Sequence, residues 1–181
     1  MDCDTRAAKI KLIIFDVDGV LTSGQIYIGR EGELMKQFHT HDGMAISAAH
    51  KVGLKTAIIT GRESEMVKFR GAELKIGDIY QAAKDKVEVL AELAAKHNLK
   101  LDEIAYVGDD LNDLAVIMKV GFGCAPANAI AEVKEQAHYT ATRAGGQGAV
   151  REIVEFILKA QGKWEDVITL YTKHGSVDTR Q

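Results

Sequence analysis

The stretch from Leu12 to Asp18 constrains the fold more than any other part of the chain. Residues 12–15 form a continuous apolar run, which is typical of a strand buried on both faces of a parallel sheet. Asp16 and Asp18 follow two residues apart, so in extended backbone their side chains point to the same side. Two like charges at the end of a buried strand cost folding free energy unless a cation or a reaction uses them. The alternative is a strand exit with solvated turn aspartates.

Short apolar strands alternate with helical segments along the rest of the chain. Strands are predicted at residues 10–15, 55–59, 79–80, 103–107 and 121–125, and helices at 43–52, 64–71, 85–97, 112–119, 130–136, 149–161 and 164–173. Residues 25–28 and 34–39 predict a β-hairpin, residues 1–9 are expected to be frayed, and Asp42 is expected to cap the helix that follows it. This alternation predicts an α/β fold: a doubly wound, Rossmann-like and mostly parallel sheet with a β-hairpin flap.

Size and composition narrow the class of protein. With 181 residues, 46% of them hydrophobic, we expect a single domain over 1–181, with a core at about 10–162 and a C-terminal helix and tail at 163–181. The net charge of −3 and the scattered basic residues give no footprint for nucleic acid. Without an apolar run of ~18 residues or a signal-peptide pattern, we expect a soluble, cytoplasmic protein with no membrane partner. Cys3 and Cys124 are too few for a disulfide framework or a zinc site.

Polar side chains follow several of the predicted strands. They are Asp16, Asp18, Thr60, Asp109 and Asp110. The carboxyl ends of parallel strands meet at one edge of the sheet, so these side chains are expected to converge there. Mg²⁺ would relieve the repulsion among the carboxylates, and Lys86, in the first turn of its predicted helix, could bring a positive charge to the same edge. Asp109 and Asp110 could instead be helix-capping acids.

This inventory suits phosphoryl transfer. An aspartate can attack phosphorus and form an aspartyl-phosphate, and a second acid can protonate the leaving alkoxide and later deprotonate water. Thr60 and neighbouring backbone N–H groups could hold the phosphate oxygens. Charge neutralisation by Mg²⁺ and a lysine would be the main source of catalysis.

The four segments Asp16-Val17-Asp18-Gly19, Thr60, Lys86 and Gly108 to Asp113 resemble, in that order, the four motifs of the haloacid dehalogenase superfamily of phosphotransferases. The resemblance implies that Asp16 is the nucleophile and Asp18 the general acid/base. It also assigns the remaining roles: Mg²⁺ held by Asp16, the backbone carbonyl of Asp18 and Asp109; the phosphoryl group by Thr60, Gly61 and Lys86; and an outer shell of Asp110 and Asp113. Lys84 is the alternative to Lys86 as the phosphoryl-binding lysine. Lys86 is preferred, because its spacing to Gly108 better matches the family.

The gaps between these motifs are too short for the cap domain of larger relatives, so the chain resembles the capless subfamily. A capless site is open to water and needs another cover. The hairpin would present the apolar residues Ile26, Ile28, Leu34 and Phe38 on edge strands. Pairing of these edges between subunits would bury them, so we expect a homo-oligomer.

Residues 16–22, 38–46, 60–62 and 145–152 resemble, more closely, the family of 3-deoxy-D-manno-octulosonate 8-phosphate phosphatases. That resemblance implies a Mg²⁺-dependent homotetramer that makes the free sugar acid for lipopolysaccharide synthesis. Phosphatases of nonulosonate 9-phosphates share much of the pattern and remain an alternative. Arg62 could hold the sugar-acid carboxylate, or be an ordinary surface residue.

Two alternatives from other classes remain. One is a phospho-accepting receiver-type domain, but there the paired acids follow the first strand and the phosphorylated aspartate lies on a later one. The other is a non-catalytic binding domain that has kept the fold, although none of the four motifs is missing here.

Overall fold

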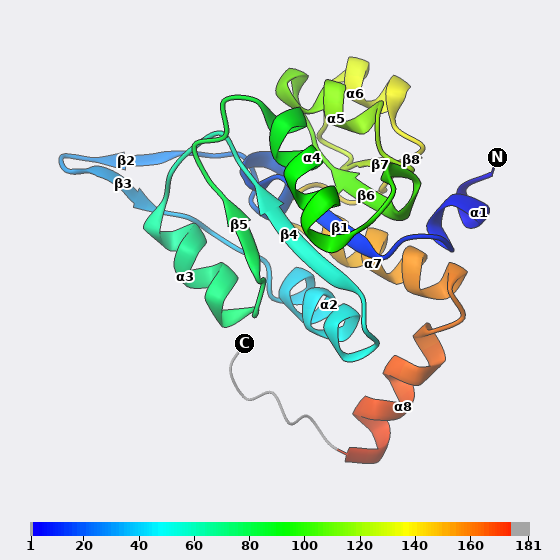
Figure 1. Cartoon of the computed structure of the whole chain (residues 1–181). Helices are drawn as coiled ribbons and strands as arrows, with labels where there is room; N and C mark the ends of the chain where they lie inside the picture. Colours follow the sequence, from blue (N-terminus) through cyan, green and yellow to red (C-terminus); the bar gives the residue numbers. More distant parts are fainter. Residues whose placement is uncertain (1, 175–181) are drawn as a thin grey trace.

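The computed structural model describes residues 2–174, and its centre is a six-stranded sheet with the order β5-β4-β1-β6-β7-β8 (Figure 1). The strands are β1 (Leu12–Phe15), β4 (Lys55–Ile59), β5 (Asp78–Tyr80), β6 (Ile104–Val107), β7 (Phe122–Ala125) and β8 (Tyr139–Thr140). Every neighbouring pair in this sheet is parallel. This is the strand order of the Rossmann fold. From β1 the chain first adds strands on one side and then, starting with β6, on the other, and such folds bind their ligands at this reversal point between β1 and β6. The predicted doubly wound α/β fold is confirmed.

Helices cover both faces of the sheet (Figure 1). One face carries α2 (Thr40–Lys51), α3 (Glu65–Glu73) and α7 (Ala149–Ala160), and the other α4 (Lys86–His97), α5 (Leu114–Ile117) and α6 (Ala131–Gln136). Strand β1 serves both cores, because successive side chains of a strand point to opposite faces. Ile13 and Phe15 pack on the α2/α7 side, whereas Leu12 and Ile14 pack on the α4/α5 side.

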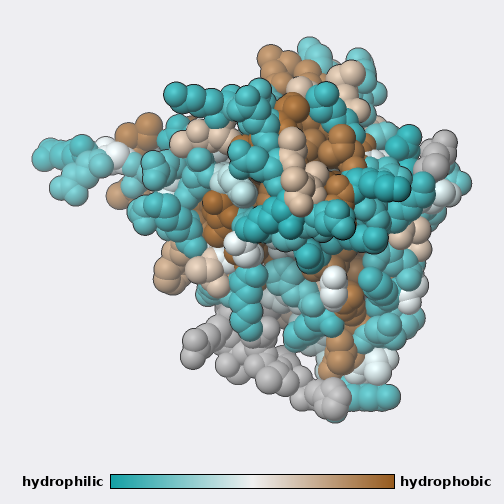
Figure 2. Space-filling view, viewed as in Figure 1, coloured by the Kyte–Doolittle hydropathy of each residue, from teal (hydrophilic) through white to brown (hydrophobic). Residues whose placement is uncertain are grey.

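The predicted hairpin is present, with shorter strands, as β2 (Tyr27–Gly29) and β3 (Gly32–Met35). It forms its own two-stranded sheet and projects from the body of the molecule (Figure 1). Several of its apolar side chains are exposed, among them Ile28 at 73% and Leu34 at 65%, and brown atoms near the base of the projection mark part of them in Figure 2. The hairpin is therefore a flap whose edges pair with no other strand of residues 2–174.

The N-terminal segment differs from the prediction. Residues 1–9 were expected to be frayed, but α1 (Cys3–Ala7) is helical. Asp2 caps it by accepting a hydrogen bond from the Thr5 N–H at 2.8 Å, Ala7 is buried, and Arg6 donates to the carbonyl of Gly121 at 2.8 Å. Docking on residues more than a hundred positions away stabilises this short helix.

Asp42 caps a different helix from the one predicted. His39 occupies the N-cap position of α2, and Asp42 lies inside its first turn, buried. The Asp42 carboxylate accepts hydrogen bonds from the N–H groups of Gly148 at 3.3 Å and Arg151 at 2.8 Å. It therefore caps the start of α7, in a distant part of the sequence.

The remaining elements lie close to their predicted ranges. The region predicted as one helix at 112–119 is a 3₁₀ turn, η3 (Leu111–Asp113), followed by α5, and η2 (Leu101–Glu103) precedes β6. The last helix is α8 (Trp164–His174); residues 175–181 of the predicted tail lie outside the described residues. None of the helices between residues 2 and 174 combines the length and apolarity needed to cross a membrane.

Candidate active site

The predicted site residues meet at the carboxyl edge of the sheet. Phe15 of β1 pairs with Ile58 of β4 on one side and with Val107 of β6 on the other, so the three strands end at nearly the same level. Asp16 continues β1 by donating its N–H to the Val107 carbonyl at 3.0 Å. The side chains that follow β1 and β6 therefore flank the reversal point of the sheet.

Three carboxylates converge at this point. Asp16, Asp109 and Asp113 each offer an oxygen, and these oxygens lie within 4.8 Å of one another. Two buried oxygens of these three carboxylates accept no hydrogen bond from the described residues: Oδ1 of Asp109, and Oδ1 of Asp16, which has an ion pair with Lys86 Nζ at 3.1 Å. Like-charged groups crowded in this way are stable only with a counter-charge.

Burial and mutual repulsion disfavour the charged forms of this acidic triad. Burial raises the pKa of Asp16 to about 6; the Asp113 charge adds to the effect and Lys86 opposes it. Burial, with the charges of Asp16 and Asp113, raises the pKa of Asp109 to about 7. The possible ligand atoms are all oxygens, and two of them accept no hydrogen bond, so the triad suits a hard divalent cation such as Mg²⁺.

Asp113 is the fixed member of the triad. Its side chain is fully buried and accepts four hydrogen bonds: from Lys86 Nζ at 2.7 Å, from the Tyr106 hydroxyl at 2.6 Å, and from the N–H groups of Asp109 at 2.9 Å and Asp110 at 3.2 Å. These bonds use both of its oxygens. Asp113 therefore holds Lys86 and the Asp109 loop in place.

Lys86, rather than Lys84, reaches the acidic triad. Its buried ammonium contacts Asp16, Asp113 and the Tyr106 hydroxyl. Burial lowers the pKa of Lys86, but the adjacent charges of Asp16 and Asp113 outweigh it and the net pKa is raised, so the lysine stays charged. Lys84 is exposed and contacts none of these groups.

The turn after β1 requires glycine. Residues Val17–Leu21 form a wide turn, η1, and Gly19 has a φ of +92°, in the left-handed region that favours glycine. A Cβ at Gly19 would also lie 2.0 Å from Oδ2 of Asp109. Only glycine lets the Asp109 carboxylate approach this turn.

Asp18 is not part of the triad, and its side chain contacts the flap. Its Oδ1 pairs with the ammonium of Lys36, just beyond β3, and its Oδ2 lies 3.8 Å from Nε of Arg62. The sequence predicted Asp18 and Arg62 at the site but not Lys36. No local pattern marks Lys36, since its partner is 18 residues away on another element.

The remaining predicted residues surround this edge. Thr60 is buried directly after β4, and its hydroxyl has no partner in the described chain. Gly61 next to it is exposed and open, because a Cβ there would meet nothing within 4 Å. Asp110 is exposed and caps η3 by accepting from the Leu111 N–H at 2.7 Å, so it lies outside the triad.

The glycine-rich loop at 145–148 supports the turn after β1. Gly146 donates its N–H to the Val20 carbonyl at 3.0 Å. Asn128 links the two segments, because it donates to the Gly19 carbonyl at 2.9 Å and accepts from the Gly145 N–H at 2.6 Å. A Cβ at Gly145 would lie 1.8 Å from the Gly19 oxygen, which explains glycine at this position.

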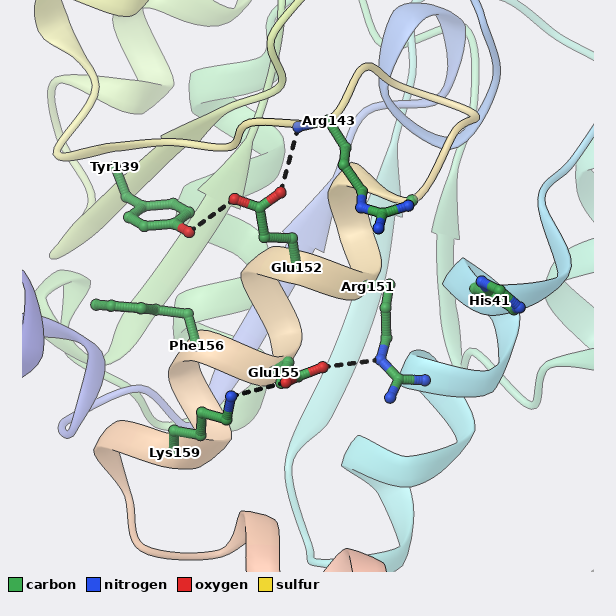
Figure 3. A pocket seen from close by; sticks show the side chains of 9 residues that line it. His41, Tyr139, Arg143, Arg151, Glu152, Glu155, Phe156 and Lys159 are labelled. Carbon is green, nitrogen blue, oxygen red and sulfur yellow. Dashed lines mark hydrogen bonds and ion pairs between the residues drawn. The ribbon is translucent and has the colours of Figure 1, made fainter.

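A separate hollow of about 570 Å³ lies beside α7 (Figure 3). It contains none of the predicted site residues, and its lining is His41, Tyr139, Arg143, Gly148, Arg151, Glu152, Glu155, Phe156 and Lys159. Its acids are already engaged: Glu155 pairs with Arg151 and Lys159, and Glu152 accepts from the Tyr139 hydroxyl and the Arg143 N–H. By accepting the hydrogen bond from Arg143, Glu152 fixes the backbone that leads into the 145–148 loop.

A Rossmann-ordered sheet with an aspartate–lysine pair and an acidic triad at its reversal point defines the class of haloacid dehalogenase-like hydrolases. The family model described as "haloacid dehalogenase-like hydrolase" matches residues 64–153. The 3-deoxy-D-manno-octulosonate 8-phosphate phosphatase KdsC of Salmonella typhi is 43% identical over 162 residues, covering 90% of this chain and 86% of the relative. The chain belongs to this family of phosphatases, and the predicted phosphoric monoester hydrolase class is confirmed.

Solved structures agree. A 3-deoxy-D-manno-octulosonate 8-phosphate phosphatase from Moraxella catarrhalis, in complex with magnesium, phosphate and the sugar acid KDO, superposes with a TM-score of 0.91. It is 41% identical, covering 93% of this chain and 97% of that one. A probable YrbI family phosphatase from Pseudomonas syringae has a TM-score of 0.92 at 44% identity, covering 95% and 98%. Both similarities extend over nearly the whole chain.

Proposed function

We propose that this chain hydrolyses 3-deoxy-D-manno-octulosonate 8-phosphate to the free sugar acid and phosphate, with Mg²⁺ as cofactor. The similarity to KdsC at 43% identity supports this substrate, and so does the likeness to a structure that contains magnesium, phosphate and KDO. The observation that carries the proposal is the position of Asp16, at the reversal point of the sheet, next to Lys86 and Asp109.

In the proposed reaction a carboxylate oxygen of Asp16 attacks phosphorus. The bond from phosphorus to the sugar oxygen breaks, and Asp18 gives its proton to that oxygen. Water then attacks the aspartyl-phosphate, Asp18 accepts a proton from the water, and the bond between phosphorus and Asp16 breaks. This second step releases phosphate and restores the free carboxylate of Asp16 and the protonated form of Asp18.

The surrounding residues would bind the transferring group. Asp16, Asp109 and the backbone carbonyl of Asp18 would hold Mg²⁺, with Asp113 and Asp110 outside them. The bound cation would neutralise charge that develops on the phosphoryl oxygens. Lys86 would neutralise a further oxygen, and the free hydroxyl of Thr60, with the backbone at Gly61, would hold another. Arg62, exposed and close to Asp18, would receive the carboxylate of the sugar acid.

The test is phosphate release from a panel of substrates: octulosonate 8-phosphate, nonulosonate 9-phosphates and ordinary sugar phosphates, each with Mg²⁺ and with EDTA. We expect Mg²⁺-dependent turnover, with the largest kcat/KM on the octulosonate. Preference for a nonulosonate would change the substrate and keep the mechanism. Absence of Mg²⁺-dependent turnover on every member would overturn the proposal.

Asp16→Asn tests the nucleophile. The amide cannot form the aspartyl-phosphate, so kcat should fall by at least ~10³-fold. The melting temperature should stay the same or rise, since one of the crowded charges is removed. Asp102→Asn is the matched control, because that carboxylate is exposed and belongs to none of the predicted site residues. Turnover of Asp16→Asn near the wild-type rate would remove Asp16 from this role.

A further inference from the structure

Lys36 is a buried cation on the flap. Its side chain is only 2% exposed, although it follows a strand of a projecting hairpin. The ammonium pairs with Oδ1 of Asp18 and lies 3.1 Å from Oε1 of Glu33. A buried ammonium is tolerated only when it is paired, so these two carboxylates fix the position of the side chain.

The flap itself is attached to the body of the molecule at this point. Glu33 on β3 uses its other oxygen to accept a hydrogen bond from the Ser64 hydroxyl, at the N-cap position of α3. A chain of contacts therefore runs from α3 through Glu33 and Lys36 to Asp18. The docked flap is what brings Lys36 to the turn after β1.

The acids at this edge of the sheet thus pair with two different lysines. Lys86 contacts Asp16 and Asp113, whereas Lys36 contacts Asp18. Without Lys36 the Asp18 side chain would keep only a partly exposed arginine at 3.8 Å. Its carboxylate would then be free to rotate about two bonds, toward solvent or toward the triad.

We infer that Lys36 is a positioning residue: from the flap it holds the carboxyl group of Asp18 in the direction from which it can pass a proton to the leaving oxygen. This inference rests on the acid role of Asp18 in the proposed function. General acid catalysis depends on a donor held within hydrogen-bond reach of the reacting oxygen, and a misplaced donor loses most of its effect.

The test compares kcat/KM on a sugar phosphate and on p-nitrophenyl phosphate. The kcat/KM value covers steps up to departure of the leaving group, and p-nitrophenolate leaves without needing a proton, so the ratio of the two values isolates the acid. Lys36→Met removes the ammonium and keeps the aliphatic stem. We expect kcat/KM on the sugar phosphate to fall at least ~10-fold, and that on p-nitrophenyl phosphate to fall less than ~3-fold.

Asp18→Asn and the double variant complete the cycle. If Lys36 acts through Asp18, the double variant should have the same ratio of the two kcat/KM values as Asp18→Asn alone. Lys68→Met, the same chemical change on an exposed lysine of α3, is the matched control and should keep the wild-type ratio. If the methionine variant does not fold, judged by its melting curve, Lys36→Gln takes its place in the same cycle.

The failures can be told apart. An Asp18→Asn variant with the wild-type ratio would remove the acid role of Asp18, and with it this inference. A changed ratio in Asp18→Asn but not in Lys36→Met would overturn the role of Lys36 alone. Equal losses on both substrates would show that Lys36 only supports the fold, and an undiminished Lys36 effect on the ratio in the Asp18→Asn background would show that Lys36 does not act through Asp18.

Discussion

At the scale of single residues, the acids of this site differ in how they are satisfied. Asp16 and Asp109 keep buried oxygens without a hydrogen bond, whereas Asp113 has four hydrogen-bond donors and Asp18 is paired with Lys36. The unsatisfied oxygens are those that can take a cation or attack phosphorus. The satisfied ones set the positions of their neighbours.

Asp113 should therefore matter most for stability. In Asp113→Asn the amide N–H group would face the N–H groups of Asp109 and Asp110, and Lys86 would lose a charged partner. We expect the free energy of unfolding, measured with urea in EDTA, to drop by about 2–4 kcal/mol. Tyr106→Phe removes one hydrogen bond to the same carboxylate and one from Lys86, leaves both charges in place, and should cost about 1 kcal/mol. A smaller loss for Asp113→Asn than for Tyr106→Phe would contradict this reading.

Asp78, at the start of β5, should give a pH-dependent contribution to stability. Burial would raise its pKa, but hydrogen bonds from Lys96 and from His97 at 2.7 Å outweigh burial and lower it below 3.8. A lowered folded-state pKa means that the stabilisation is complete above the unfolded-state pKa and is lost as the pH falls through the folded-state value. The difference in free energy of unfolding between wild type and Asp78→Asn should thus shrink as the pH falls below about 4.

Asp102→Asn is the control for this pH series. The Asp102 carboxylate is exposed, and its ion pair with Lys9 is 3.9 Å long, so its removal should change stability little at any pH. If the Asp78→Asn difference instead grew as the pH fell below about 4, the sign of the pKa shift would be wrong.

At the scale of elements, the site is supported by segments that follow it far along the chain. The 145–148 loop holds the turn after β1, and Asp42 of α2 holds the end of that loop by capping α7. The acids are thus positioned by α2 and α7 as much as by the strands that carry them.

Asp42→Ala should uncover this dependence. The loss of the cap on α7 should cost about 1–2 kcal/mol in free energy of unfolding. The 145–148 loop, which leads into α7, contacts the turn at Gly19 and Val20. We therefore expect kcat to fall as well, on the order of tenfold, although Asp42 is not part of the acidic triad. Asp42→Asn, which keeps one of the two acceptor oxygens, should be milder in both measurements. Full activity in Asp42→Ala would show that the loop does not position the turn.

The same elements show how far sequence reasoning reaches. Strands such as β4 and helices such as α4 were predicted to within about a residue, because their apolar period and capping residues are local signals. Helix α1 was missed because long-range contacts stabilise it, and β8 because two residues carry no period. Asp42 was assigned to the wrong helix and Lys36 was overlooked for one reason: their partners are distant in sequence.

At the scale of the whole molecule, the site lies at the edge of the sheet, and the described chain inserts no cap domain above it. We propose that the chain is one domain with α8 appended to its core, and that other copies of the chain supply the missing cover. Unpaired edges and exposed apolar side chains on the flap support this proposal, and Phe69, 74% exposed on α3, adds to the apolar surface. Apolar surface of this kind is typical of a contact between proteins.

The assembly can be tested by placing charges on the flap. Light scattering after size exclusion should give a tetramer for the wild-type chain and a smaller species for Ile28→Lys combined with Leu34→Lys, because each lysine would have to be desolvated at the contact. The melting curve of the dissociated variant should still show a cooperative transition, since neither side chain is part of the core. Its kcat/KM should fall, because the flap carries Lys36 and its docking on α3 would lose the support of neighbouring copies. Leu101→Lys, at an exposed apolar residue that precedes β6 at the other end of the sheet, should leave the assembly intact. A wild-type chain that is monomeric at micromolar concentration would overturn the proposed tetramer, and full activity in a monomeric flap variant would show that the site needs no cover from a neighbour.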